Sequence, residues 1–180
     1  MQNLWAPWRA AYVLGEAQAA GACFFCVNPA RPERFAEDYV LHATPEVSVM
    51  LNLYPYGSGH LLVAPRDHVA RLGDLTPAVH DALFRMVTVA AGVLEQAMAP
   101  QGLNIGINQG RVAGAGVVDH VHVHLVPRWN GDTNFMPVVA ATTVLPQHLD
   151  TVYAELRPRF AALAAQGPGG AGGAGSPHGS

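Results

Sequence analysis

The 180-residue sequence predicts one α+β domain, an antiparallel sheet packed with one long helix and a C-terminal helix. Three patterns indicate this class. Short β-type stretches separated by turn residues occupy 38–66 and 103–126, a helical repeat of apolar residues fills 76–99, and another repeat follows residue 145. The chain is long enough to bury most of its apolar surface without disulfides.

The segment 38–66 predicts two or three antiparallel strands. The first begins at Tyr39, the second covers 47–53, and the third covers 60–64 before Pro65. The intervening Tyr-Pro-Tyr-Gly-Ser-Gly run at 54–59 has the composition of a turn.

Thr76 and Pro77 form the cap and first-turn pair that is typical of a helix start. Apolar residues then recur at helical spacing until Pro100, which predicts the longest helix of the chain. They are Val79, Leu83, Met86, Val87, Ala90 and Leu94.

The second half predicts another antiparallel pair, over 103–108 and 117–126, with a Gly-rich loop at 110–116 between the strands. A C-terminal helix is expected to start at Leu145. Its Leu149, Val152 and Leu156 would share one face, and Pro158 should end or kink it.

Composition divides the chain into three parts: an N-terminal arm (1–22), the folded domain (23–165) and a disordered tail (166–180). The last fourteen residues are almost wholly Gly, Ala, Pro and Ser, too poor in bulky side chains to offset the entropy of ordering. The arm carries Trp5 and Trp8, which we expect to dock on another surface.

Charge and hydropathy exclude several classes of protein. The formal charge is −3, and no basic run could follow a nucleic-acid backbone. No uninterrupted apolar stretch is long enough for a membrane span, so neither nucleic acid nor membrane is an expected partner. The two cysteines, Cys23 and Cys26, suit metal ligation or redox exchange, and a reducing cytoplasm is the expected compartment.

The most informative pattern is His120, His122 and His124, which alternate with Val121 and Val123. Side chains on a strand alternate between faces, so the spacing predicts three imidazoles on one face and apolar residues on the other. A metal-binding stripe or a chance polar face would give the same spacing. The Gly-rich loop just upstream predicts backbone N–H groups turned towards an anion, so a phosphate would fit between loop and histidines.

These residues resemble the histidine triad (HIT) superfamily of nucleotide hydrolases and transferases. The resemblance rests on Gly-Arg-Val-Ala-Gly-Ala-Gly at 110–116, the three histidines, and Val-Pro-Arg at 126–128. The segments 129–137 and 4–9 look more narrowly like a bacterial branch related to diadenosine tetraphosphate phosphorylases. The resemblance covers residues 4 to about 160 and implies the histidine triad fold.

The resemblance implies a covalent mechanism. His122 is the expected nucleophile on the α-phosphorus, forming a nucleotidyl-histidine that water or phosphate resolves. His124 is expected to orient it in a fixed tautomer. The amides of Gly114, Ala115 and Gly116 would meet the charge that develops on the phosphoryl oxygens.

Further nucleotide contacts are implied at four positions. Asn52 would bind the ribose hydroxyls, His60 would line the pocket, and Arg128 would lie at its mouth, near terminal phosphates. Many relatives carry Gln or Ser near 116–117, where this chain has no side-chain donor. Asn108, backbone amides or a water would take over the leaving-group contact.

The resemblance also implies a structural zinc bound by four side chains: Cys23, Cys26, His68 and His120. Zinc bound there would tie the N-terminal segment to the strand of the nucleophile. Two alternatives are buried free thiols and a thioredoxin-like redox pair, although the βαβ context of the latter is absent.

The leading function is therefore cleavage of a dinucleoside polyphosphate such as diadenosine tetraphosphate, by hydrolysis or phosphorolysis. Alternatives are a nucleoside phosphoramidate hydrolase and a nucleotide-binding regulatory module with little turnover. By the same resemblance, the long helix and an edge strand would form the interface of a homodimer.

Overall fold

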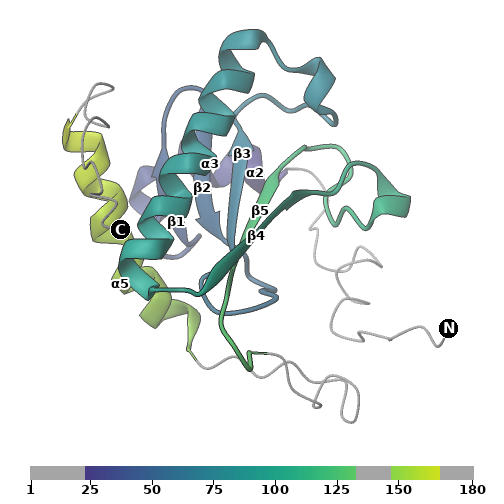
Figure 1. Cartoon of the computed structure of the whole chain (residues 1–180). Helices are drawn as coiled ribbons and strands as arrows, with labels where there is room; N and C mark the ends of the chain where they lie inside the picture. The colour runs from purple at the N-terminus through teal and green to yellow at the C-terminus, as the bar shows by residue number, and fades with distance from the viewer. Residues whose placement is uncertain (1–22, 133–146, 167–180) are drawn as a thin grey trace, which may run out of the picture.

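The computed structural model describes residues 23–132 and 147–166, and it has the predicted α+β architecture (Figure 1). Five strands form one sheet in the order β1-β2-β3-β5-β4, with all four neighbouring pairs antiparallel. The strands are β1 (Val40–Ala43), β2 (Val47–Leu51), β3 (Leu61–Pro65), β4 (Gly102–Ile107) and β5 (Val123–Arg128). The predicted arm and nearly all of the predicted tail lie outside the described residues.

Helices α3 (Pro77–Met98) and α5 (Leu149–Gln166) cover one face of this sheet, and the one-turn helix α2 (Phe24–Val27) lies on the other (Figure 1). Four short 3-10 turns complete the described part: Asn28–Ala30, Pro32–Arg34, Leu72–Asp74 and Arg111–Ala113. The predicted cap of the long helix is confirmed, because the Thr76 hydroxyl accepts a bond from the backbone of Val79.

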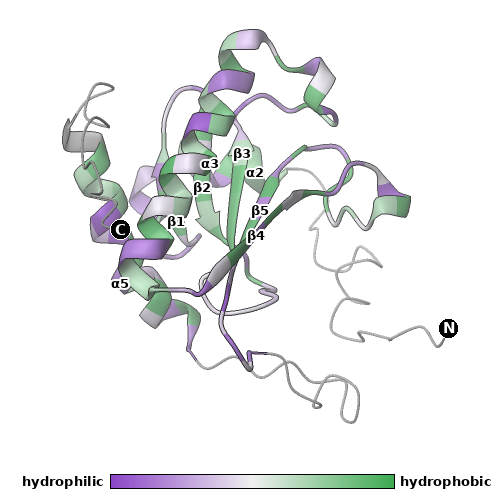
Figure 2. Ribbon diagram, viewed as in Figure 1, coloured by the Kyte–Doolittle hydropathy of each residue, from purple (hydrophilic) through white to green (hydrophobic). Residues whose placement is uncertain are grey.

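Strand alternation separates two apolar clusters. Val49, Val63 and Leu125 face the large cluster shared with α3 and α5, whereas Met50 and Leu62 face a smaller one around α2. Figure 2 shows the central strands as strongly hydrophobic, while α3 alternates between hydrophobic and hydrophilic faces. The even-numbered residues of β5 therefore lie on the α2 side of the sheet.

Helix α3 is long and apolar enough, by length and composition alone, to cross a membrane, and within the described residues it alone meets that test. Its Leu83, Ala90 and Leu94 are fully buried in the cluster against the sheet. Packing in the core accounts for the apolar face of this helix.

The last strand corrects one prediction, since β5 begins at Val123 rather than at 117. The β3–β5 pairing ends at Val63 and Val123, and the same register would bring Pro65 opposite Val121. Pro65 has no N–H, so it cannot donate a hydrogen bond to extend the pairing. The N–H of Val121 instead donates to the carbonyl of Val69, at 2.7 Å. His120 and His122 consequently precede the strand, and only His124 belongs to it.

The C-terminal helix corrects another prediction. Residues 147–148 are not helical and α5 begins at Leu149, while the predicted start at Leu145 lies outside the described residues. The helix then passes through Pro158 and runs to Gln166. Pro158 forfeits one backbone bond, but Val152, Leu156 and Phe160 are buried against the sheet on both sides of it. Tertiary packing outweighs the local penalty.

Candidate active site and metal centre

The three histidines gather in one cluster on the α2 side of the sheet. The rings of His122 and His124 meet edge-on, with their centroids 4.8 Å apart. Phe25 from α2 packs its ring 5.0 Å from that of His120 and 4.8 Å from that of His122. His120 and His122 are buried, and the ring of Phe25 packs against both.

A backbone carbonyl determines the tautomer of His122. Its Nδ1 lies 2.8 Å from the carbonyl oxygen of His120. A carbonyl only accepts, so Nδ1 carries the proton and the lone pair is on Nε2. Burial lowers the pKa of His122, although the bond to the His120 carbonyl opposes that shift. The result is a neutral imidazole with a nucleophilic nitrogen.

A second chain of bonds determines the tautomer of His124. The backbone N–H of Tyr56 donates to Nδ1 of His60 at 3.1 Å, and the amide of Asn52 lies 3.3 Å from the same nitrogen. Neutral His60 therefore carries its proton on Nε2, which lies 3.0 Å from Nδ1 of His124. His124 accepts this bond, so its own N–H is on Nε2.

The Gly-rich loop differs from the predicted phosphate cradle. Gly114 has a φ of 85°, and its N–H donates to the carbonyl of Arg111. The N–H of Ala115 donates to the carbonyl of Gly110. The 3-10 turn thus uses two of the three amides predicted to face phosphate, and Gly116 makes no such backbone bond among the described residues. The phosphate-binding role of this loop stays a prediction.

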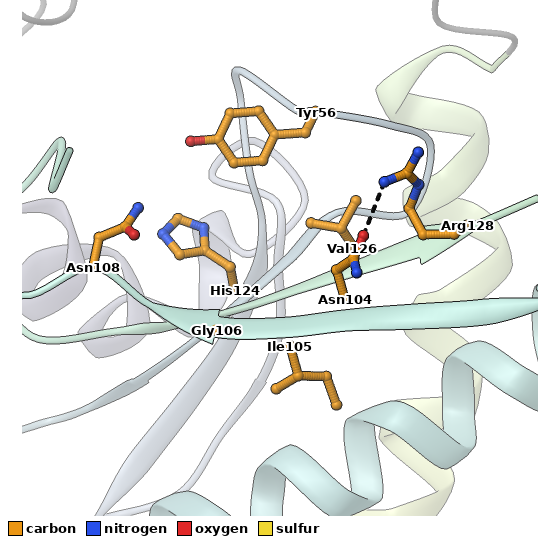
Figure 3. Close-up of a pocket in the computed structure, with 8 residues that line it drawn as sticks. All are labelled: Tyr56, Asn104, Ile105, Gly106, Asn108, His124, Val126 and Arg128. Atoms are coloured by element: carbon orange, nitrogen blue, oxygen red, sulfur yellow. Dashed lines mark hydrogen bonds between the residues drawn. The ribbon is translucent and has the colours of Figure 1, made fainter. Parts of the chain in front are cut away.

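A pocket of about 340 Å³ opens beside His124, between the strands β4 and β5 and the loop before β3 (Figure 3). Asn108 and His124 lie at one end, and Asn104 and Arg128 lie at the other. Tyr56 covers the space between them. Asn108 and Arg128 thus lie in one pocket with His124, while Asn52 and His60 lie on the β2–β3 side.

Arg128 makes more bonds than the sequence suggested. Its Nε and Nη2 donate to both carboxylate oxygens of Asp132, at 2.6 and 2.7 Å, and its Nη1 donates to Asn104 at 2.9 Å. These bonds to the guanidinium hold the pKa of Asp132 at about 2. The charge of Arg128 is therefore already compensated.

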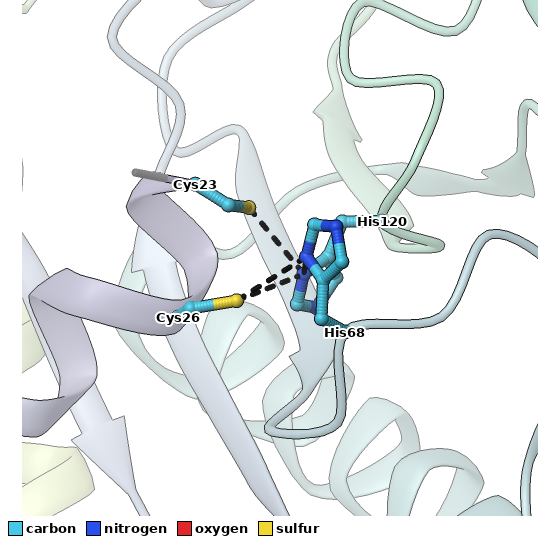
Figure 4. A group of neighbouring side chains, drawn as sticks. All are labelled: Cys23, Cys26, His68 and His120. Carbon is cyan, nitrogen blue, oxygen red and sulfur yellow. Dashed lines mark hydrogen bonds between the residues drawn. The ribbon is translucent and has the colours of Figure 1, made fainter. Parts of the chain in front are cut away.

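Cys23, Cys26, His68 and His120 converge as the resemblance implied (Figure 4). One ligand atom from each lies within 4.8 Å of the others. The two histidine Nδ1 atoms are 3.3 Å apart, and three of the four sulfur-to-Nδ1 separations are 3.3–3.6 Å. A tetrahedral zinc with ordinary bond lengths requires about 3.3 Å between nitrogens and about 3.6 Å between nitrogen and sulfur.

The surroundings of this cluster also suit a cation. Burial, together with Cys23, raises the pKa of Cys26 to about 11, so its thiolate needs a positive neighbour. Burial lowers the pKa of His120 to about 4, which keeps that ligand neutral. Nε2 of His120 donates to the carbonyl of Pro65 at 2.9 Å, leaving Nδ1 for the metal. The four side chains could therefore hold a metal ion.

The sequence reading missed four residues of the site. Phe25 is a buried residue of the smaller core, and it also contacts two of the three histidines. Tyr56, Asn104 and Asp132 had no motif to mark them, although alternation along β4 places Asn104 on the same face as Gly106, the partner of His124.

A five-stranded antiparallel sheet with three clustered histidines beside it, one of which, His124, lines a small pocket, defines a protein of the histidine triad class. The chain belongs to the HIT family: residues 33–131 match the model of the HIT domain. An "AP-4-A phosphorylase" of Mycobacterium tuberculosis is 37% identical over 155 residues, covering 83% of this chain and 79% of that protein.

One further relative and one solved structure are also similar to this chain. A "Bis(5'-nucleosyl)-tetraphosphatase [asymmetrical]" of Schizosaccharomyces pombe is 41% identical, over 52% of this chain and 50% of that protein. The fold is similar to that of a solved "ZN-bound histidine triad family protein" of Mycobacterium smegmatis. Its TM-score is 0.61 at 24% identity, over 81% of this chain and 97% of the other.

Proposed function

We propose that this protein cleaves dinucleoside polyphosphates such as diadenosine tetraphosphate at the α-phosphate, through a nucleotidyl-His122 intermediate. The observation that carries the proposal is the bond from Nδ1 of His122 to the carbonyl of His120, which leaves Nε2 unprotonated. The homologous phosphorylase and tetraphosphatase support this substrate class.

In the first step, Nε2 of His122 bonds to the α-phosphorus and the bond to the bridging oxygen breaks. The nucleotide leaves as a polyphosphate anion, and the Nε2–H of His124 stabilises that charge by donating a hydrogen bond to the departing oxygen while keeping its proton. In the second step, inorganic phosphate or water attacks the same phosphorus and releases Nε2 of His122. The proton of the attacking water or phosphate passes to solvent, and His122 and His124 regain their starting state.

The remaining predicted contacts complete this proposal. Asn52 keeps one amide hydrogen for a ribose hydroxyl, because its other polar bonds go to His60 and to the backbone of Tyr54. Gly116 offers an amide to the phosphoryl oxygens, and Asn108 lies beside His124 where a bridging oxygen would lie. Gly114 and Ala115 would contribute amides only if their turn opened.

We assign the cluster of two cysteines and two histidines to a structural zinc. The ion would supply cross-linking rather than chemistry, since His122 attacks phosphorus directly. His120 contributes Nδ1 to this cluster and its carbonyl to His122, so the same residue anchors the nucleophile. Thiolate ligands persist in a reducing compartment, which supports the cytoplasm as the location.

We also propose a homodimer. Strand β4 is an edge strand whose Ile105 is 50% exposed, and Phe84 on α3 is 38% exposed. Both are apolar side chains at the predicted interface. Sedimentation should give a dimer for the native chain and a monomer for Ile105→Glu. A native monomer would contradict this part of the proposal.

The test incubates the protein with diadenosine tetraphosphate, with and without phosphate, and separates the products by chromatography. ADP and ATP formed only with phosphate indicate a phosphorylase, and AMP and ATP formed without it indicate a hydrolase. His122→Ala should abolish both, whereas the exposed His148→Ala should not. Intact-mass measurement should show one nucleotidyl group on the native chain alone.

Two outcomes would favour the alternatives. Faster turnover of an adenosine phosphoramidate would indicate a phosphoramidate hydrolase. Unchanged substrate that nevertheless binds would indicate a regulatory module.

A further inference from the structure

The pocket beside His124 is built to hold more than the reacting phosphate. His124, Val126 and Arg128 are alternate residues of β5, so they line one face over about 13 Å. Their partners on β4 are Gly106, Asn104 and Gly102. A Cβ at Gly106 would meet nothing within 4 Å, so the space over this part of the sheet is open.

This pocket lies on the opposite side of His124 from Asn52. The sheet order places β5 between β3 and β4, with Asn52 and His60 on the β3 side and the pocket on the β4 side. Attacking and leaving atoms of phosphoryl transfer stand roughly in line. The departing oxygen lies opposite Nε2 of His122 and, in the proposed mechanism, beside the Nε2–H of His124, so the leaving group extends into the pocket that His124 lines.

The far end of the pocket is polar but neutral. Asp132 offsets the charge of Arg128 with two bonds, so this end attracts a polyphosphate weakly. Asn104 accepts a bond from Arg128, which leaves its amide NH₂ as a donor without a partner among the described residues. Uncharged donors of this kind suit the acceptor nitrogens of a purine edge.

An aromatic ring forms the roof of the pocket. Tyr56 stacks on His60, with centroids 4.8 Å apart and an angle of 26° between the planes, and its side chain is still 45% exposed. Figure 3 shows this ring above the strands, facing Val126 and the Arg128–Asn104 pair. Aromatic faces bind nucleobases by stacking.

From these observations we infer that the pocket under Tyr56 is the subsite for the leaving purine nucleoside of a dinucleoside substrate. Tyr56 stacks on its base, and Asn104 donates to a ring nitrogen. The Arg128–Asp132 pair holds Asn104 in place and keeps this end uncharged. The inference rests on the proposed function and adds the recognition of the second nucleoside.

The experiment compares two substrates that share the same reacting phosphate. Diadenosine tetraphosphate has a second nucleoside and adenosine 5'-tetraphosphate does not. We expect kcat/KM of the native protein to be about tenfold or more higher for the dinucleoside. Tyr56→Ala and Asn104→Ala should each reduce that ratio towards one, and Tyr56→Phe should preserve it.

Tyr54→Ala is the matched control, because Tyr54 is an exposed tyrosine of the same loop, 44% exposed, and does not line the pocket. A general disturbance of His60 by Tyr56→Ala lowers turnover of both substrates and leaves their ratio unchanged. This inference alone is overturned if the native protein has the same kcat/KM for both substrates. It is also overturned if the ratio of the two kcat/KM values is unchanged in both alanine variants. Failure of the native protein to cleave either substrate overturns the proposed function and this inference together.

Discussion

Two backbone groups decide which nitrogen of each active-site imidazole carries a proton. The carbonyl of His120 holds the proton of His122 on Nδ1, and the N–H of Tyr56 fixes the opposite tautomer of His60. Nε2 of His60 then donates to Nδ1 of His124 at 3.0 Å, which fixes the tautomer of His124. His124 therefore presents a donor and His122 an acceptor, although the two rings are neighbours on one face.

Replacing His60 should slow the reaction without preventing binding. His60→Phe removes the donor to His124, and we expect kcat to fall by about a hundredfold with KM nearly unchanged. His60→Gln keeps a donor at the position of Nε2 and should recover part of the rate. The exposed His80→Phe is the control. A His60→Phe enzyme with native kcat would show that His60 does not set the tautomer of His124.

His42 on β1 makes stability depend on pH. Burial, and then the charge of Arg157, lower its pKa below 6.5. Because the unfolded chain binds the proton more readily, the stability from neutral His42 is complete above pH 6.5 and is lost as the pH falls towards the folded-state pKa. His42→Phe should therefore lose less stability than the native protein between pH 7.5 and 5.

Urea unfolding at several pH values measures this difference. His148→Phe serves as the control, since the His148 side chain is 78% exposed. If the free energy of unfolding changed with pH equally in the native protein and in His42→Phe, His42 would not be the source of the pH dependence.

At the scale of elements, the loop between β2 and β3 contributes most to the candidate site, because Asn52, Tyr56 and His60 all belong to it. Gly59 closes this loop with a φ of 76°, a conformation that favours glycine. A Cβ there would lie 2.5 Å from the sulfur of Met98 at the end of α3. The long helix thus limits how far the loop can shift away from the pocket.

Gly59→Ala should destabilise the protein by about 2 kcal/mol, from the left-handed backbone and the contact with Met98. Gly57→Ala is the matched control, because a Cβ at Gly57 has no neighbour closer than 3.8 Å and no positive φ. Urea midpoints of the two variants measure the effect. Equal midpoints would show that the loop adapts.

At the scale of the whole molecule, the candidate metal cluster of Cys23, Cys26, His68 and His120 joins three distant parts of the chain. Cys23 precedes α2 and Cys26 lies within it, His68 follows β3, and His120 precedes β5. Phe25 enters the smaller core between the two cysteines and contacts His122. The same arrangement that closes the domain thus restrains the ring of His122.

Removal of the metal should lower the melting temperature by roughly 10 °C, because a bound ion contributes several kcal/mol to the folded state. Metal analysis should find one zinc per chain, and a chelator should produce the shift. A Cys23→Ala/His68→Ala variant should already melt low and be insensitive to chelator. A zinc-free native protein that melts at the same temperature with and without chelator would exclude the structural role.

The amino-acid sequence by itself determined the α+β class, the long helix with its Thr76 cap, the order of the strands along the chain and the residues of the metal cluster. The class, the helix and the strand order follow from local periodicity, whereas the four residues of the cluster follow from the resemblance to the histidine triad superfamily. The predicted start of the last strand was wrong, because Pro65 cannot donate a hydrogen bond and the N–H of Val121 donates to the carbonyl of Val69 instead. The pairing with β3 therefore ends before His122.

Only the tertiary structure decided which bonds the site residues make. Pairing of strands far apart in sequence brought Asn104 to Arg128 and His60 to His124. Folding of the loop back on itself used the amides of Gly114 and Ala115. Periodicity reports which face a side chain occupies, whereas the partner across that face depends on contacts between distant segments, which local spacing does not encode.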